Sequence, residues 1–134
     1  MKYVFGSIIF CSITNIACNG KFTEKKKSKE FIPGTYVLFF ESKFTKGSDT
    51  LVISRMGGNA YTILDKISYH FLKEDMHLPD VHESRHYTAV WDEKYNILKE
   101  INSYRSFRFE PDSNKLYMGN IKFEKVKNDT PDLF

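Results

Sequence analysis

From Phe31 onward the chain alternates apolar and polar residues with the period of two that is typical of half-buried β-strands. Turn residues such as Pro33-Gly34, Gly57-Gly58-Asn59 and Pro111-Asp112-Ser113-Asn114 separate these runs. We interpret the following runs as strands: Thr35–Ser42, Asp49–Arg55, Ala60–Leu72, Ser84–Asp92, Tyr95–Asn102, Tyr104–Glu110, Lys115–Met118 and Ile121–Lys127. The pattern predicts an all-β fold, an antiparallel meander of about eight strands that forms a small barrel or sandwich.

The N-terminal segment has a different pattern. Lys2 precedes an apolar run from Tyr3 to Ile16, and Ala17-Cys18 follows. At about 14 residues the run is shorter than the roughly 20 of a membrane-spanning helix and fits the 7–15 of an export signal. A small residue before a cysteine is typical of lipoprotein processing, although Asn15 departs from that pattern. We expect residues 1–17 to be a signal peptide and Cys18 to be lipidated, with ordinary secretion as the alternative.

The remaining chain then divides into three parts: a basic flexible tether (18–30), the β domain (31–128) and a disordered tail (129–134). The net charge of +3 comes from Lys2 and the Lys-rich tether, because residues 31–134 carry 14 Lys and Arg against 15 Asp and Glu. A nucleic-acid surface needs its basic residues on the folded domain. We therefore expect no nucleic-acid partner. Instead we expect attachment to the membrane through the lipid anchor.

Cysteine and histidine usage argues against catalysis and against a metal site. Cys11 would leave with the signal and Cys18 would be acylated, so the domain keeps no thiol and no disulfide. The four histidines lie between His70 and His86, and His82 and His86 have the spacing of a helical zinc pair. On a strand that spacing separates them by about 13 Å. We expect no metal, no cofactor and no enzymatic activity.

One group of residues suggests a ligand site. Arg85, Tyr87 and Trp91 share one strand face, and Arg105 shares a face with Phe107 and Phe109. Core packing with an arginine at the rim is the favoured interpretation. The alternative is a barrel mouth in which Arg85, Tyr87, Trp91 and Arg105 bind an amphipathic, anionic ligand.

Several segments resemble a set of small Bacteroidetes lipoproteins of unassigned function, which often occur in mobile-element and conjugation contexts. Besides Cys18, these segments are Phe31–Val37, Asp49–Arg55, Thr88–Glu93, the pair Leu98 and Glu100, and Phe107–Asn120. The resemblance implies a cell-envelope location, anchored in the outer membrane and facing the periplasm or the cell surface. It implies no catalytic residues.

A weaker resemblance is to lipocalin-like barrels. Gly34-Thr35-Tyr36 stands where those proteins have Gly-x-Trp, and Lys125 is the basic residue nearest to their late arginine. Together these features predict a lipid-anchored, non-catalytic envelope domain with a binding or structural role, and another envelope protein is its candidate partner. The alternative is a lipocalin-like carrier of a small amphipathic ligand.

Overall fold

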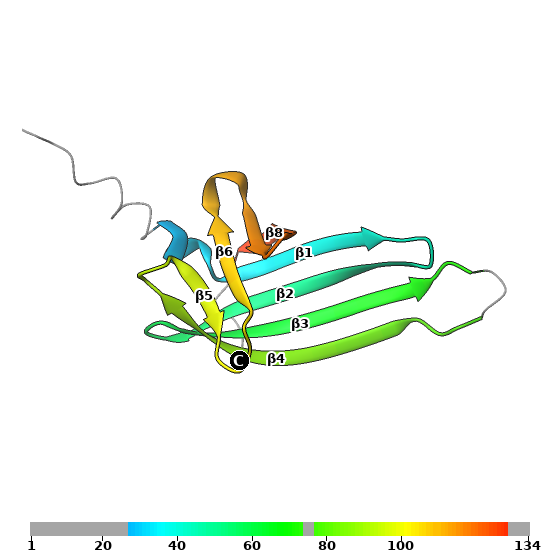
Figure 1. Cartoon of the computed structure of the whole chain (residues 1–134), viewed down its shortest axis with the longest axis horizontal. Coiled ribbons are helices and arrows are strands. Elements are labelled where there is room, and N and C mark those ends of the chain that lie inside the picture. The colour runs from blue at the N-terminus through cyan, green and yellow to red at the C-terminus, as the bar shows by residue number, and fades with distance from the viewer. Residues whose placement is uncertain (1–26, 74–76, 129–134) are drawn as a thin grey trace, which may run out of the picture.

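The computed structural model describes residues 27–73 and 77–128. A short helix over residues 27–31 precedes the first strand. The strands are β1 (Gly34–Glu41), β2 (Thr45–Gly57), β3 (Ala60–Phe71), β4 (Val81–Asp92), β5 (Ile97–Glu100), β6 (Ser106–Glu110), β7 (Lys115–Met118) and β8 (Ile121–Asn128), with a 3₁₀ turn at Pro111–Ser113 (Figure 1). The all-β meander of eight strands is confirmed.

The meander closes into a barrel rather than a sandwich. Every strand pairs antiparallel with the next, and β8 pairs with β1 to complete the circle. In that last ladder Gly34–Val37 lies against Glu124–Asn128, with a bulge between Thr35 and Tyr36. Bulges increase local twist and bend a strand, which helps a small sheet to close on itself.

Alternate residues of each strand fill the barrel. The fully or almost fully buried apolar side chains are Ile32, Tyr36, Leu51, Ile53, Tyr61, Ile63, Ala89, Trp91, Leu98, Phe107, Phe109, Leu116 and Phe123. Phe109 makes ring contacts with Tyr36 at 5.9 Å and with Trp91 at 6.3 Å between centroids. The closed part of the barrel is therefore packed with aromatic side chains.

The helix over residues 27–31 covers one end of this core. Ser28 and Ile32 are buried, and the Tyr36 hydroxyl donates to the backbone oxygens of Phe31 at 2.7 Å and Ile32 at 2.9 Å. Lys27 pairs with Asp112. Residues 27–30, which we expected to belong to the flexible tether, are therefore part of the fold, because the apolar residues that follow them hold them against the barrel.

Gly34 allows β1 to approach β8 closely. Its φ is +146°, and a Cβ atom there would lie 2.5 Å from the backbone oxygen of Lys127. An L side chain rarely adopts this φ and would meet the neighbouring backbone. The Pro33-Gly34 pair, which the sequence predicts to be a turn, is thus also the point at which the barrel closes.

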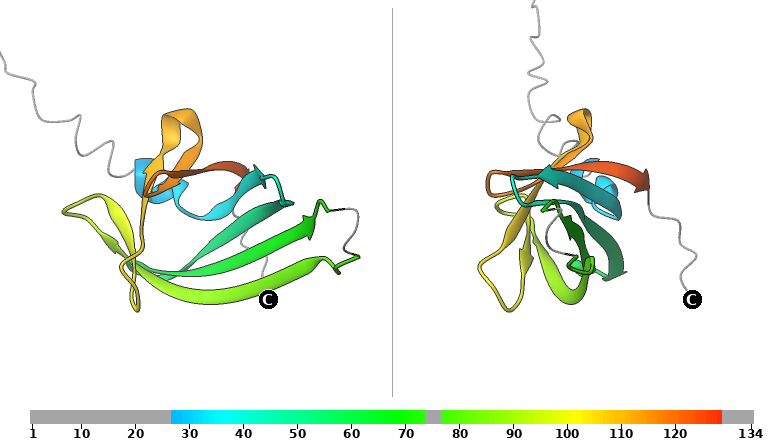
Figure 2. Two further views of the ribbon diagram at one scale, coloured as in Figure 1. Left: turned by 45° about the vertical axis from the view of Figure 1, so that its right-hand side comes forward. Right: turned by 90° about the vertical axis from the view of Figure 1, so that its right-hand side faces the viewer.

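The strands differ greatly in length. β2, β3 and β4 have 13, 12 and 12 residues, whereas β5, β6 and β7 have 4, 5 and 4. The distal parts of β1 to β4 therefore extend beyond the closed barrel as a curved four-stranded sheet (Figures 1 and 2). We call this part the extension; it comprises residues 38–41, 45–49, 67–71 and 81–85.

The extension is longer than the sequence pattern indicated. β2 begins at Thr45 and not at Asp49, and β4 begins at Val81 and not at Ser84. In the structure Thr45–Ser48 pairs with Ser68–Phe71 of β3. The polar residues and the glycine of this stretch resemble a connection in sequence, but the backbone ladder needs no apolar side chains to continue.

Candidate functional site

The barrel interior continues onto one face of the extension. Because side chains alternate along a strand, stepping by two from the buried residues of β1, β3 and β4 reaches six apolar residues and, on β4, also Tyr87 and the charged pair Arg85 and Glu83. We call the six apolar residues the inner face: Leu38, Phe40, Ile67, Tyr69, Phe71 and Val81. All six are only partly buried. β8 pairs with β1 only as far as Val37, and β5 pairs with β4 only from Ala89 onward. Figure 1 shows β5 and β6 at the other end of the sheet, away from the extension.

Gly47 allows aromatic side chains to meet on this face. The register places Gly47 of β2 between Phe40 of β1 and Tyr69 of β3. The rings of Phe40 and Tyr69 lie 6.5 Å apart, and those of Tyr69 and Phe71 lie 5.6 Å apart. A side chain at Gly47 would collide with the Ser68 backbone and with Tyr69. Sequence reasoning placed Gly47 in a loop and missed this role.

A charged cluster lies where the inner face meets the closed barrel. The Arg105 guanidinium donates from Nε to Glu100 Oε2 at 2.7 Å, and its Nη1 lies 3.7 Å from Asp65 Oδ2. It also stacks on the Tyr87 ring at 4.2 Å from the centroid. The side chains of Asp65 and Glu100 are only 5% exposed. Arg105 therefore neutralises two buried carboxylates.

Asp49 adds a third carboxyl to this cluster. The pKa of Asp49 is raised to about 7, and burial is the largest cause. Hydrogen bonding to Asp65 and charge repulsion from it also raise the pKa, whereas the charge of Arg105 lowers it. Within the described residues, the Oδ1 atoms of Asp49 and Asp65 are both buried without a hydrogen-bond partner. The cluster thus holds more carboxyls than Arg105 alone neutralises, and Asp49 takes up a proton near neutral pH.

The four residues that the sequence suggested as a ligand site do not form a single site. Tyr87 and Arg105 lie together in the charged cluster. Trp91 is 3% exposed and belongs to the core, so it lines no opening. Arg85 is exposed and donates to Glu83 at 2.8 Å; a hydrogen bond with Tyr87, followed by that to Glu83, raises the pKa of its guanidinium.

The guanidiniums of Arg85 and Arg105 both already pair with carboxylates of the chain. This weakens the interpretation of these residues as a barrel mouth that binds an anionic ligand. Sequence reasoning missed the carboxyl side of the cluster. A signal for Asp65 was present, because it shares its strand face with Tyr61, Ile63 and Ile67. A charged residue in such a row is typical of a buried ion pair.

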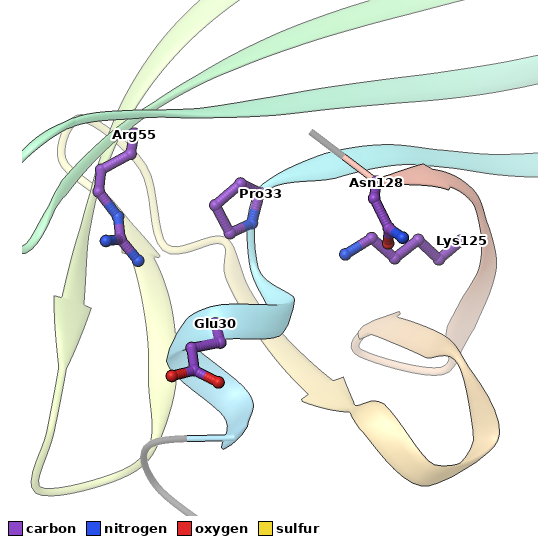
Figure 3. A pocket seen from close by; sticks show the side chains of 5 residues that line it. All are labelled: Glu30, Pro33, Arg55, Lys125 and Asn128. Carbon is purple, nitrogen blue, oxygen red and sulfur yellow. The ribbon is translucent and has the colours of Figure 1, made fainter. Parts of the chain in front are cut away.

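A separate pocket lies at the barrel end that carries the helix over residues 27–31. It has a volume of about 400 Å³ and is lined by Glu30, Pro33, Arg55, Lys125 and Asn128 (Figure 3). Lys125 is buried as a residue; its ammonium donates to the Phe31 backbone oxygen at 2.5 Å and lies over the Phe31 and Tyr36 rings at 4.1 and 5.5 Å. Lys125 therefore packs against Tyr36 of the Gly34-Thr35-Tyr36 segment.

In the described part of the chain, no three His, Cys, Asp or Glu residues are grouped so that they could hold a metal ion. His82 Nδ1 and Ser68 Oγ instead share a hydrogen bond at 2.8 Å across β3 and β4. Cys18, the expected lipidation site, lies outside the described residues. Among the described residues, we find no helix with the length and apolar character needed to cross a bilayer.

Comparisons with known proteins returned nothing for this chain: no family model, no curated protein and no solved structure matches it.

Proposed function

We propose that this protein is a non-catalytic binding domain of the cell envelope, and that its inner face binds an apolar segment of another envelope protein. The observation that carries the proposal is the combination of a filled barrel with a partly exposed row of aromatic and aliphatic side chains on the extension. A carrier needs an interior cavity, whereas a docking module needs an accessible apolar face. Here the interior near Trp91 is packed and the inner face is accessible.

The aromatic residues of the inner face suit such a contact. Aromatic side chains are enriched at the centres of protein interfaces because each buries a large area at low entropic cost. Phe40, Tyr69 and Phe71 form a continuous row through their ring contacts. Leu38 and Ile67 extend this row toward the closed barrel. The partner segment is therefore expected to be apolar.

Site-specific photo-crosslinking tests this proposal. A photoreactive amino acid at Tyr69 should crosslink the chain to a defined envelope protein, because Tyr69 lies on the inner face. The same group at Ser68, the neighbouring residue on the outer face, should give no such product. Equal crosslinking from the two positions, or none from Tyr69 in the folded protein, would contradict the proposal.

The proposal includes attachment to the membrane through a lipid on Cys18. It rests on the export-signal pattern of the first 18 residues. Envelope fractionation of the wild type and of Cys18→Ala tests it. We expect the wild type in the membrane fraction and the variant in the soluble envelope fraction. Unchanged membrane association of the variant would contradict the lipid anchor.

A second candidate is a carrier of a small amphipathic molecule bound on the inner face. The observation that favours it is the position of Tyr87 and Arg105 at the inner end of the apolar row. Mass spectrometry of the purified protein, after organic extraction, separates the two candidates. A stoichiometric small molecule that is lost in Tyr69→Asp would favour the carrier over the docking module.

A further inference from the structure

The outer edge of β4 is unpaired over most of its length. β5 pairs with β4 only from Ala89 to Asp92, and one further bond runs from the Ile101 N–H to the Thr88 carbonyl at 3.0 Å. Among the described residues, no strand lies beside Val81–Tyr87 on that side. Figure 1 shows β4 as the outermost strand of the extension, and the left view of Figure 2 agrees.

The printed hydrogen bonds fix which backbone groups face this edge. The Trp91 N–H donates to Asn59 on the β3 side, whereas Thr88 accepts on the β5 side. Because backbone groups alternate along a strand, the even-numbered residues His82, Ser84 and His86 direct their N–H and C=O groups outward. An open strand edge of this kind is a template for pairing with another strand.

The sequence of this edge is self-complementary. It reads Val81-His82-Glu83-Ser84-Arg85-His86-Tyr87. We propose that two copies of this chain pair antiparallel through their β4 edges, about a two-fold axis at Ser84. This register places Glu83 opposite Arg85 of the second copy, and Arg85 opposite its Glu83.

The hydrogen-bond geometry agrees with this register. Ser84 faces Ser84 of the second copy, and His82 faces its His86; all are outward-directed residues, so each opposed pair can exchange two backbone hydrogen bonds. Glu83 and Arg85 lie on the same face as Val81 and Tyr87. The opposed charges are therefore flanked by apolar pairs, and opposite charges directly across a ladder stabilise it.

Neighbouring registers fit less well. Moving the axis to His82 places Arg85 opposite Pro79 and Glu83 opposite Val81, so that neither charged residue faces one of opposite charge. Moving it to His86 places Glu83 opposite Ala89, where β5 already occupies the edge. In the Ser84 register the new ladder runs from Val81 to Tyr87. It therefore stops one residue before Thr88, whose carbonyl already accepts a hydrogen bond from the Ile101 N–H.

This contact is isologous, since each copy uses the same residues. It extends the proposed function in one respect. A two-fold axis perpendicular to the sheet brings the inner faces of both copies to the same side. The dimer would then present one wider apolar surface to a partner.

Oxidative crosslinking of the full chain in membranes tests the dimer, with Cys11→Ser as the parent. Ser84→Cys should form a disulfide-linked dimer, because its Cα lies about 5.5 Å from that of the second copy. His82→Cys is the matched control on the same strand face, about 13 Å from its own counterpart. Equal yields from Ser84→Cys and His82→Cys, or a yield from Ser84→Cys no higher than the parent's, would overturn the proposal.

Exchanging the charges at positions 83 and 85 tests the register without relying on the Cα distances between the cysteines. In the Ser84→Cys protein, Arg85→Glu places like charges opposite each other and should lower the crosslinked fraction about tenfold. Adding Glu83→Arg should restore it. Lys122→Glu, an exposed change on β8, should leave it unchanged. Full crosslinking in Arg85→Glu, or failure of the folded double exchange to recover, would overturn the register.

Discussion

Arg105 connects three elements through its side chain, because it contacts Asp65 on β3, Tyr87 on β4 and Glu100 on β5. Removing one member of a buried charge pair leaves the other uncompensated, and this costs far more than the pair itself contributes. At the scale of single residues, we therefore expect the stability of the fold to be sensitive to changes in this cluster.

We therefore predict that Arg105→Ala lowers the free energy of unfolding by about 3 kcal/mol, as measured by denaturant titration. Arg108→Ala is the matched control. Arg108 also stacks on a tyrosine and pairs with a glutamate, but it is exposed. Its loss should cost less than about 1 kcal/mol. Similar losses of stability in the two variants would contradict the view that Arg105 matters because its partner carboxylates are buried.

Asp49 should give the stability a distinctive pH dependence. Its pKa is raised to about 7 in the folded chain from an ordinary value of 3.8. The unfolded chain therefore loses this proton at lower pH than the folded chain. The contribution of Asp49 to stability is full below pH 3.8, and it is lost as the pH rises toward about 7.

Asp49→Asn should remove this dependence. At pH 8 the variant should be more stable than the wild type by about 1–2 kcal/mol, after allowance for solvent screening. At pH 4 the difference should be smaller. Thermal unfolding at a series of pH values measures both. A gap between variant and wild type that does not change with pH would contradict the assigned role of Asp49.

Residue-level sequence reasoning succeeded where alternation alone determines position. Trp91 packs in the core as the favoured interpretation held, and Tyr87 and Arg105 do meet. The carboxyl partners of Arg105 could not be derived from the sequence, because Arg105 lies in the connection between β5 and β6. The period of two predicts which face of a strand a side chain occupies, but it does not predict where a connection places its side chains.

At the scale of elements, the number and order of strands follow from the alternation and the turn residues. The strand ends do not. Lys46-Gly47-Ser48 has the composition of a turn, yet it continues β2 because β3 offers it a partner. The short helix over residues 27–31 lies in a charged stretch, and tertiary contacts of the adjacent Ile32 and Tyr36 hold it in place.

Gly47 provides a test at this scale. A Cβ atom there would meet the Ser68 backbone and Tyr69, so Gly47→Ala should lower the free energy of unfolding by about 2 kcal/mol. Ser48→Ala, the next residue on the opposite face, should change it by less than about 0.5 kcal/mol. Denaturant titration checks both. Equal losses of stability in the two variants would contradict the view that β2 and β3 approach too closely at Gly47 to admit a side chain.

At the scale of the whole molecule, the sequence left barrel and sandwich undecided, because closure depends on how β1 meets β8 across nearly the full length of the domain. The structure adds a second feature that composition does not reveal. The unequal strand lengths give one chain both a filled barrel and an open extension. The filled part supplies stability, and the extension supplies the surface on which our account of function depends.

The most direct test of that account compares Phe40→Asp with Phe39→Asp in affinity purification of the full chain from solubilised envelopes. The two residues are adjacent on β1, but Phe40 lies on the inner face and Phe39 is 80% exposed on the outer face. We predict that Phe40→Asp loses the co-purifying partner protein while Phe39→Asp retains it at the wild-type level. Retention of the partner by a folded Phe40→Asp protein, or equal loss in both variants, would contradict binding through the inner face.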